Sequence, residues 1–186
     1  MPRRVDHEQR RTEIALGVLA VVADGGLAAV SLRSVAEAAG VSMGRVQHYF
    51  GSKRELVLHA CRTVMDLAEE QHLAAAGLSP HERIRHLLVM GIPTTVDGRR
   101  GVGVWYAFVV GAATDPELAG LVTEGWRNLR ADLVSLLAEA GAVECEQLAD
   151  ALAAMVDGLV LRVALGSLTA SQAQAAVERQ LQAVLR

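Results

Sequence analysis

Apolar residues recur along most of the chain at intervals of three and four positions, which is the spacing of one face of an α-helix. In the first long segment, about residues 6–24, Ile14, Val18, Val21 and Val22 follow this spacing, and two glycines come directly after it. No segment shows the strict alternation of a strand. About nine helices are therefore predicted, over residues 6–24, 32–39, 43–50, 53–76, 80–91, 105–109, 116–140, 144–166 and 170–186.

Capping residues mark where several of these helices begin. Ser31 and Ser42 each precede an apolar helical stripe, as N-cap residues do. Other starts combine an N-cap hydroxyl with Glu or Gln three positions later, which is the capping box, and they occur at Ser52 with Glu55, Ser79 with Glu82 and Thr169 with Gln172. These signals predict the starts of five helices independently of the apolar period.

The two short helices after Ser31 and Ser42 are joined by a tight turn that contains Gly40, which is the plan of a helix-turn-helix. The next helix has no internal Pro or Gly, so we expect it to link two modules rigidly. Two domains are predicted: a helix-turn-helix domain over residues 1–51 and a larger helical domain over residues 52–186, with 52–76 as the linking helix. Farther along, residues 97–100 are predicted to form a polar turn, and Gly101-Val102-Gly103 to make that turn flexible.

Composition supports an all-α protein. A chain of 186 residues with 52% hydrophobic residues can bury a substantial core without disulfides or metals. Only 3% of the residues are aromatic and four are Pro, which favours helices over sheets. No apolar run approaches the ~18 residues that span a bilayer. Cys61 and Cys145 stand alone and the first residues are polar, so we expect a cytoplasmic protein with no membrane partner.

Charge is unevenly distributed along the chain. Residues 1–60 hold eight basic and six acidic side chains, net +2, whereas the remainder holds ten basic and fifteen acidic ones, net −5. A basic N-terminal module suits a polyanionic partner. In a helix-turn-helix the second helix lies in the major groove of DNA, so its outward residues must be polar or small. Val46 and Phe50 are predicted to pack inward, which leaves the face from Ser42 to His48 outward.

The residue types on this face fit the chemistry of DNA. Arg45 can donate two hydrogen bonds to guanine O6 and N7, and Gln47 can pair with adenine. Gly44 permits a close backbone approach, and Arg3 with Arg4 can form a minor-groove arm. Hydroxyls and cations at helix starts suit phosphates, and these are Ser31, Arg33, Ser52 and Lys53.

A signature of fixed order and spacing resembles the TetR family of bacterial transcriptional regulators. It comprises Ser31-Leu32-Arg33-Ser34-Val35-Ala36-Glu37-Ala38-Ala39-Gly40-Val41-Ser42, then Met43-Gly44-Arg45-Val46-Gln47-His48-Tyr49-Phe50, then Ser52-Lys53-Arg54-Glu55-Leu56. The resemblance implies an N-terminal three-helix DNA-binding domain and a C-terminal domain for ligand binding and dimerisation. The residues expected at the DNA are Ser31, Arg33, Ser42, Met43, Gly44, Arg45, Gln47, His48, Tyr49, Ser52 and Lys53.

The resemblance also implies a mode of action. Family members are homodimers that bind palindromic operators in double-stranded DNA, usually as repressors, and are released by a small-molecule effector without a cofactor. Two recognition helices about 34–36 Å apart meet successive major-groove turns. The last two helices are expected to form the dimer interface. The layout from Trp105 to Leu118, with Asp157-Gly158-Leu159, is similar to BetI-type C-terminal domains. Residues expected to line the effector site are Met90, Trp105, Tyr106, Phe108, Trp126, Met155, Leu159 and Arg162.

Two alternatives remain open from the residues themselves. Each side chain expected at the effector site could be a core residue, and the protein could be an architectural or co-regulator DNA-binding protein without a ligand pocket. Enzymatic chemistry is disfavoured. His81 and His86 are five positions apart, whereas the HExxH zinc motif needs four. No metal is therefore predicted, and both cysteines are expected to be small buried hydrophobes.

Overall fold

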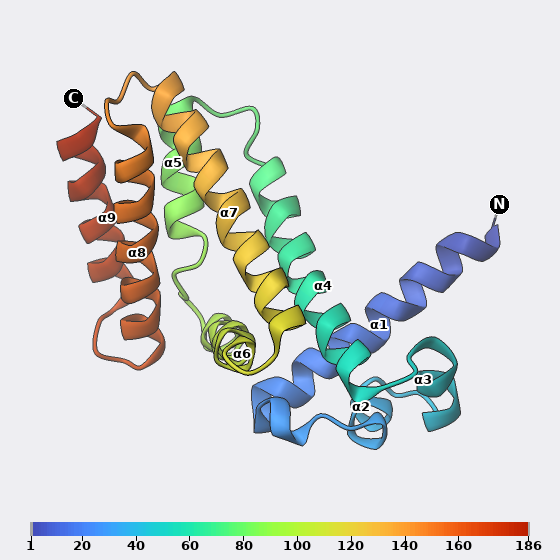
Figure 1. Cartoon of the computed structure of the whole chain (residues 1–186). Coiled ribbons are helices and arrows are strands. Elements are labelled where there is room, and N and C mark those ends of the chain that lie inside the picture. Colours follow the sequence, from blue (N-terminus) through green and yellow to red (C-terminus); the bar gives the residue numbers. More distant parts are fainter. Residues whose placement is uncertain (1, 186) are drawn as a thin grey trace. The chain divides into compact units, whose positions relative to one another are not determined.

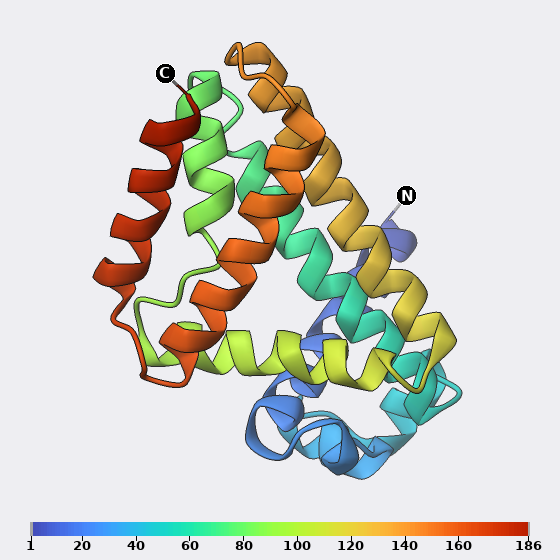
Figure 2. The same cartoon turned by 60° about the vertical axis from the view of Figure 1, so that its left-hand side comes forward.

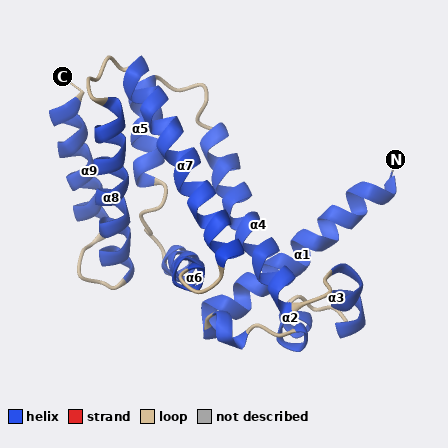
Figure 3. Ribbon diagram, viewed as in Figure 1, coloured by secondary structure: helices blue, strands red, loops and turns tan. Residues whose placement is uncertain are grey.

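The computed structural model describes residues 2–185, with side chains described from His7 onward. The predicted minor-groove arm of Arg3 and Arg4 therefore lies outside the described side chains. Within residues 2–185 the regular structure is entirely helical (Figure 3). The elements are α1 (Pro2–Gly25), the 3-10 helix η1 (Leu27–Ala29), α2 (Leu32–Ala38), α3 (Met43–Tyr49), α4 (Lys53–Leu73), α5 (Pro80–Val89), α6 (Val96–Ala112), α7 (Pro116–Glu139), α8 (Cys145–Ala164) and α9 (Ala170–Val184).

The chain forms two compact units, and each contains segments distant in sequence. The first unit comprises the residues up to Leu67 together with Gly103–Val122. The second comprises Ala68–Val102 together with the residues from Thr123 onward. The first unit therefore contains the helix-turn-helix, most of α4, the C-terminal part of α6 and the start of α7.

A hydrophobic core fills the first unit. Ile14 from α1, Val46 from α3, Leu56 from α4 and Phe108 from α6 are each at most 1% exposed and belong to one cluster. Close backbone approach supports this packing at Gly17, where an added Cβ would lie 2.8 Å from the Ala39 Cβ and 3.1 Å from its backbone nitrogen. A glycine at this position thus lets α1 approach the end of α2.

The second unit is a helical bundle with its own buried residues. Here α9 packs on α5 and α8, and the three helices run side by side in both views (Figures 1 and 2). Each helix of the bundle buries one stripe at helical spacing, as an amphipathic helix does. The buried side chains of α5, α8 and α9 include Ile84, Leu88, Leu152, Val163, Ala173, Val177 and Leu181.

The five helix starts that were predicted from capping residues agree with the structure, whereas α1 begins at Pro2 and α6 at Val96, earlier than predicted. The hydroxyls of Ser31 and Ser42 accept hydrogen bonds from backbone N–H groups three residues on, at 3.0 and 3.2 Å. The capping boxes that begin at Ser79 and Thr169 are complete. The box at Ser52 is shifted: Ser52 accepts from the Glu55 N–H, but the Glu55 carboxylate accepts from Gly51 N–H at 2.8 Å.

The predicted polar turn over Asp97–Arg100 is wrong, and so is the turn assigned to Gly101-Val102-Gly103. Both segments lie inside α6. Glycine is about 1 kcal/mol less favourable than alanine in a helix interior, which made this stretch resemble a loop. The helix begins there because Thr95 Oγ1 accepts a hydrogen bond from the Gly98 N–H at 2.9 Å and so acts as a cap.

The linking helix ends at Leu73, three residues before the predicted end, because the chain tightens into turns. The N–H groups of Ala75 and Ala76 donate to carbonyls three residues back, those of His72 and Leu73. Of the helices in residues 2–185, none is long and apolar enough to cross a membrane.

Candidate nucleic-acid interface

Helix α3 is held by its inner face and presents its outer face to solvent. Val46 is fully buried and Phe50, which ends the helix, is 1% exposed. The turn before α3 is possible because Gly40 adopts a left-handed φ of 65°. Ten of the eleven residues predicted at the DNA are exposed: Ser31, Arg33, Ser42, Met43, Gly44, Arg45, Gln47, His48, Ser52 and Lys53.

Two cations on this surface are free to bind an anion. Within the described part of the chain, the guanidinium groups of Arg33 and Arg45 have neither an ion pair nor a hydrogen bond. Arg33 lies in the first turn of α2 and Arg45 in the first turn of α3. Unpaired guanidinium groups are suited to phosphates and to the base edges of guanine. Beside them Met43 is 49% exposed, an apolar side chain that could contact a thymine methyl group.

The hydroxyls of the predicted interface are already used as caps. Ser31, Ser42 and Ser52 each accept a hydrogen bond from a backbone N–H. Lys53 donates to the Ala28 carbonyl at 3.3 Å and stays exposed. These serines therefore orient helix starts whose remaining free N–H groups suit phosphates.

Tyr49 differs from the other ten residues because it is half-buried among aromatic rings. Its ring lies 4.7 Å from that of His7 and 5.1 Å from that of His48, centroid to centroid. The contact with His7 brings α1 beside the end of α3 (Figure 1). The ring of Tyr49 thus supports the end of the recognition helix from α1.

Arg11 is a residue of this region that sequence reasoning missed. It donates from Nη1 to the Tyr49 carbonyl at 2.8 Å, and its guanidinium lies 4.4 Å from the centre of the Phe50 ring. Its Nη2 is 3.6 Å from a carboxylate oxygen of Glu55. Arg11 therefore joins α1 to the end of α3 and to the first turn of α4. No sequence signal revealed this role, because the bond joins residues 38 positions apart.

The residues predicted to line an effector site are divided between the two units. Trp105, Tyr106 and Phe108 belong to the first unit, where Phe108 is fully buried in the core and Trp105 packs against it. The others belong to the second unit: Met90, Trp126, Met155, Leu159 and Arg162. The ligand role of all eight stays a prediction.

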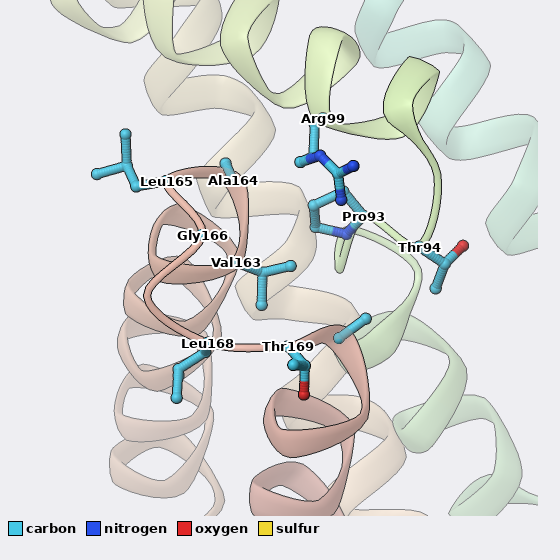
Figure 4. A pocket seen from close by; sticks show the side chains of 10 residues that line it. Pro93, Thr94, Arg99, Val163, Ala164, Leu165, Gly166, Leu168 and Thr169 are labelled. Atoms are coloured by element: carbon cyan, nitrogen blue, oxygen red, sulfur yellow. The ribbon is translucent and has the colours of Figure 1, made fainter.

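A pocket of about 460 Å³ lies within the second unit, between the residues before and in the first turn of α6 and the turn joining α8 to α9. Figure 4 shows Arg99 and Pro93 on one side and Leu165 and Gly166 on the other. The lining residues are Pro93, Thr94, Arg99, Val163, Ala164, Leu165, Gly166, Leu168, Thr169 and Ala170. None of the eight residues predicted at the effector site is among them.

Two family models match the chain in the order that the two predicted modules suggest. The model described as "Bacterial regulatory proteins, tetR family" matches residues 19–60, which include α2 and α3. The model described as "BetI-type transcriptional repressor, C-terminal" matches residues 80–186, more than half of the chain.

Known proteins are similar over nearly the whole chain. The transcriptional regulator PksA of Bacillus subtilis is 32% identical over 173 residues, covering 89% of this chain and 83% of the relative. The regulator BetI of Rhizobium meliloti is 33% identical over 170 residues, covering 90% of this chain and 84% of the relative. These relatives are transcriptional regulators and not enzymes.

Solved structures share the fold. A transcriptional regulator from Rhodococcus sp. has a TM-score of 0.85 and 31% identity, covering 94% of this chain and 95% of the other. A regulator from Saccharomonospora viridis in complex with choline has a TM-score of 0.81 and 20% identity, covering 94% of this chain and 96% of the other. The chain therefore belongs to the TetR family of DNA-binding transcriptional regulators and has a C-terminal domain of the BetI type.

Proposed function

We propose that the protein is a dimeric repressor that reads a palindromic operator with α3 and leaves it when a small molecule binds its C-terminal domain. The observation that carries the proposal is the exposed outer face of α3 and the start of α2, with the unpaired cations Arg45 and Arg33. In this proposal Arg45 and Gln47 contact bases, and Arg33 and Lys53 contact phosphates.

A dimer is proposed because one short helix contacts too few bases to specify a site in a genome. Helix α8 and its C-cap residue Leu165 offer a suitable second surface, which we call the α8 face: Ala151, Ala154, Gly158, Leu161 and Leu165. All five are exposed at spacings of three and four, and Leu165 is 76% exposed. Small residues in such a stripe let another helix approach closely, and the leucines supply apolar area. The α8 face is proposed to pack, with α9, against the same helices of a second copy.

The effector acts in this proposal by differential affinity. A ligand weakens operator binding only if it binds better to the conformation that does not fit DNA, and each ~1.4 kcal/mol of that preference is about tenfold in operator affinity. Choline is the first compound to test, because BetI-type regulators are relatives and one structural neighbour contains it. The chain has six aromatic residues, so an aromatic cage for a quaternary ammonium group has few candidates.

The proposal is tested by binding of purified protein to a labelled duplex from upstream of its own gene, with excess competitor DNA and at two salt concentrations. The expected result is a competitor-resistant complex of two chains per palindrome, and its release by a compound that also raises the melting temperature of the protein.

The same assay separates the alternative function. Binding that competitor abolishes, with a steep salt dependence, would mean contacts to phosphates only and would favour an architectural protein. Operator binding that no thermally stabilising compound weakens would overturn the effector part of the proposal alone.

A further inference from the structure

Part of the C-terminal domain is built into the DNA-binding unit. The BetI-type family model spans residues 80–186, yet Gly103–Val122 belongs to the same compact unit as the helix-turn-helix. Phe108 and Leu118 are buried in one cluster with Val46 of α3 and Leu56 of α4. The end of α6 and the start of α7 are therefore anchored in the core that supports the recognition helix.

An ion-pair network joins this segment to the residue directly after Lys53. Arg54 donates from Nη2 to Asp115 Oδ1 at 2.8 Å and from Nε to Asp115 Oδ2 at 3.2 Å, a two-point contact. Its Nη2 is also 3.2 Å from a carboxylate oxygen of Glu117. The hydrogen bond from Arg54 is the main reason that the pKa of Asp115 lies below its usual value. Asp115 also caps α7, because it accepts from the N–H groups of Glu117 and Leu118.

The first turn of α4 is the place where three attachments meet. Lys53 donates to the Ala28 carbonyl of η1, and Glu55 accepts from Gly51 N–H and pairs with Arg11. Arg54, between them in sequence, attaches the same turn to the start of α7. A two-point guanidinium–carboxylate contact fixes orientation as well as distance.

We propose that Arg54 is a positioning residue for operator binding: its contact with Asp115 and Glu117 lets the C-terminal domain hold the first turn of α4, and with it α3, in the arrangement that fits DNA. The inference rests on the proposed operator-binding function. It adds that two carboxylates, which repel DNA by their charge, favour operator binding through Arg54.

The chain contains a matched control. Arg130 in the second unit likewise pairs with two carboxylates, at 2.6 Å from Asp150 and 3.2 Å from Glu146. The side chains of Arg130 and Arg54 are both largely accessible to solvent, with exposed fractions of 40% and 56%. Exposed ion pairs contribute little to stability, so the two networks should differ in their effect on operator binding and not in their effect on folding.

The experiment measures operator affinity and affinity for a scrambled duplex, with four variants of the full-length chain. They are Arg54→Gln, Asp115→Asn, the double variant and Arg130→Gln. Asparagine is a good N-cap residue, so Asp115→Asn removes the charge and keeps the cap of α7. Melting temperatures of all four establish that each variant is folded.

The expected result is that Arg54→Gln and Asp115→Asn both weaken operator binding by at least about threefold, that the double variant is no weaker than the worse single one, and that Arg130→Gln matches the wild type. If these residues affected DNA binding only through their charge, removing the cation at Arg54 would weaken binding, whereas removing the anion at Asp115 would strengthen it. Tighter or unchanged operator binding by folded Asp115→Asn would overturn the inference. Failure of the wild-type protein to prefer the operator to the scrambled duplex would instead overturn the proposed function.

Discussion

The outer faces of α3 and α8 are both exposed stripes on helices whose opposite sides are buried, but their chemistry differs. The α3 face carries Arg45, Gln47 and His48, which offer hydrogen-bond donors and positive charge. The α8 face offers small and apolar side chains, with Leu161 40% and Leu165 76% exposed. Exposure to water costs a polar face little free energy, whereas an apolar stripe is stabilised when another surface covers it. This difference supports the proposal that the α3 face binds DNA and the α8 face binds a second copy of the chain.

The largest effect should come from placing a charge on the α8 face. If the α8 face forms the proposed dimer, Leu161→Glu should convert it to a monomer and weaken operator binding by about 100-fold, because a monomer engages one half-site. Analytical ultracentrifugation and operator titration measure both effects. Val143→Glu is the control, since Val143 is 79% exposed in the second unit and outside the α8 face. A dimeric Leu161→Glu variant would show that the α8 face is not the interface.

The α3 face depends on the packing beneath it, and Gly17 tests that dependence. Gly17→Ala should destabilise the first unit by about 1–3 kcal/mol, because the added Cβ meets the backbone of Ala39 at 3.1 and 3.2 Å. Thermal unfolding measures the change. Gly120→Ala, in α7, is the matched control: its Cβ meets nothing within 4 Å, so this variant should be as stable as the wild type or more so.

Acid should weaken the support of α3, and this is the smallest effect expected. The His59 ring lies 5.2 Å from the Phe50 ring, its Nε2 is buried without a partner, and burial, with Arg11 as a second cause, lowers its pKa. The charges of Glu8 and Asp66 raise the pKa of His59, whereas the charge of Arg62, like that of Arg11, lowers it. Because the unfolded chain takes up this proton at a higher pH than the folded one, stability falls as the pH drops through ~6.5.

The measurement for His59 is the loss of melting temperature between pH 7 and pH 5. The loss should be smaller in His59→Gln than in the wild type, and unchanged in His81→Gln, because His81 is exposed. An equal loss in the wild type and in His59→Gln would mean that other groups cause the acid sensitivity.

Much of the fold could be predicted because its signals are local. A cap such as Ser79 with Glu82 acts over three residues, and the buried stripe of a helix repeats within one segment. The error at residues 97–103 has the same origin: glycine-rich sequence favours a turn locally, but a cap at Thr95 and burial of Val104 favour the helix. A local cap and a tertiary contact together decided the outcome there.

The candidate site was predictable to the extent that it is a surface. Arg45 was expected to face outward because Val46 and Phe50 were expected to face inward. In the structure Arg45 is exposed, and Val46 and Phe50 are buried. The partners of Arg11 and Arg54 were not predictable, because these contacts join residues 38 and 61 positions apart. Such long-range pairs leave no periodicity or spacing in the sequence.

The most direct test of the central claim, that α3 reads base sequence, is the ratio of operator to scrambled-duplex affinity for Arg45→Ala, with Arg127→Ala as an exposed control in the second unit. We predict that Arg45→Ala weakens operator binding by about 1–3 kcal/mol and leaves scrambled-duplex binding nearly unchanged. Arg127→Ala should change neither affinity. An equal loss on both duplexes would show that Arg45 contacts only phosphate and would contradict base reading by this residue.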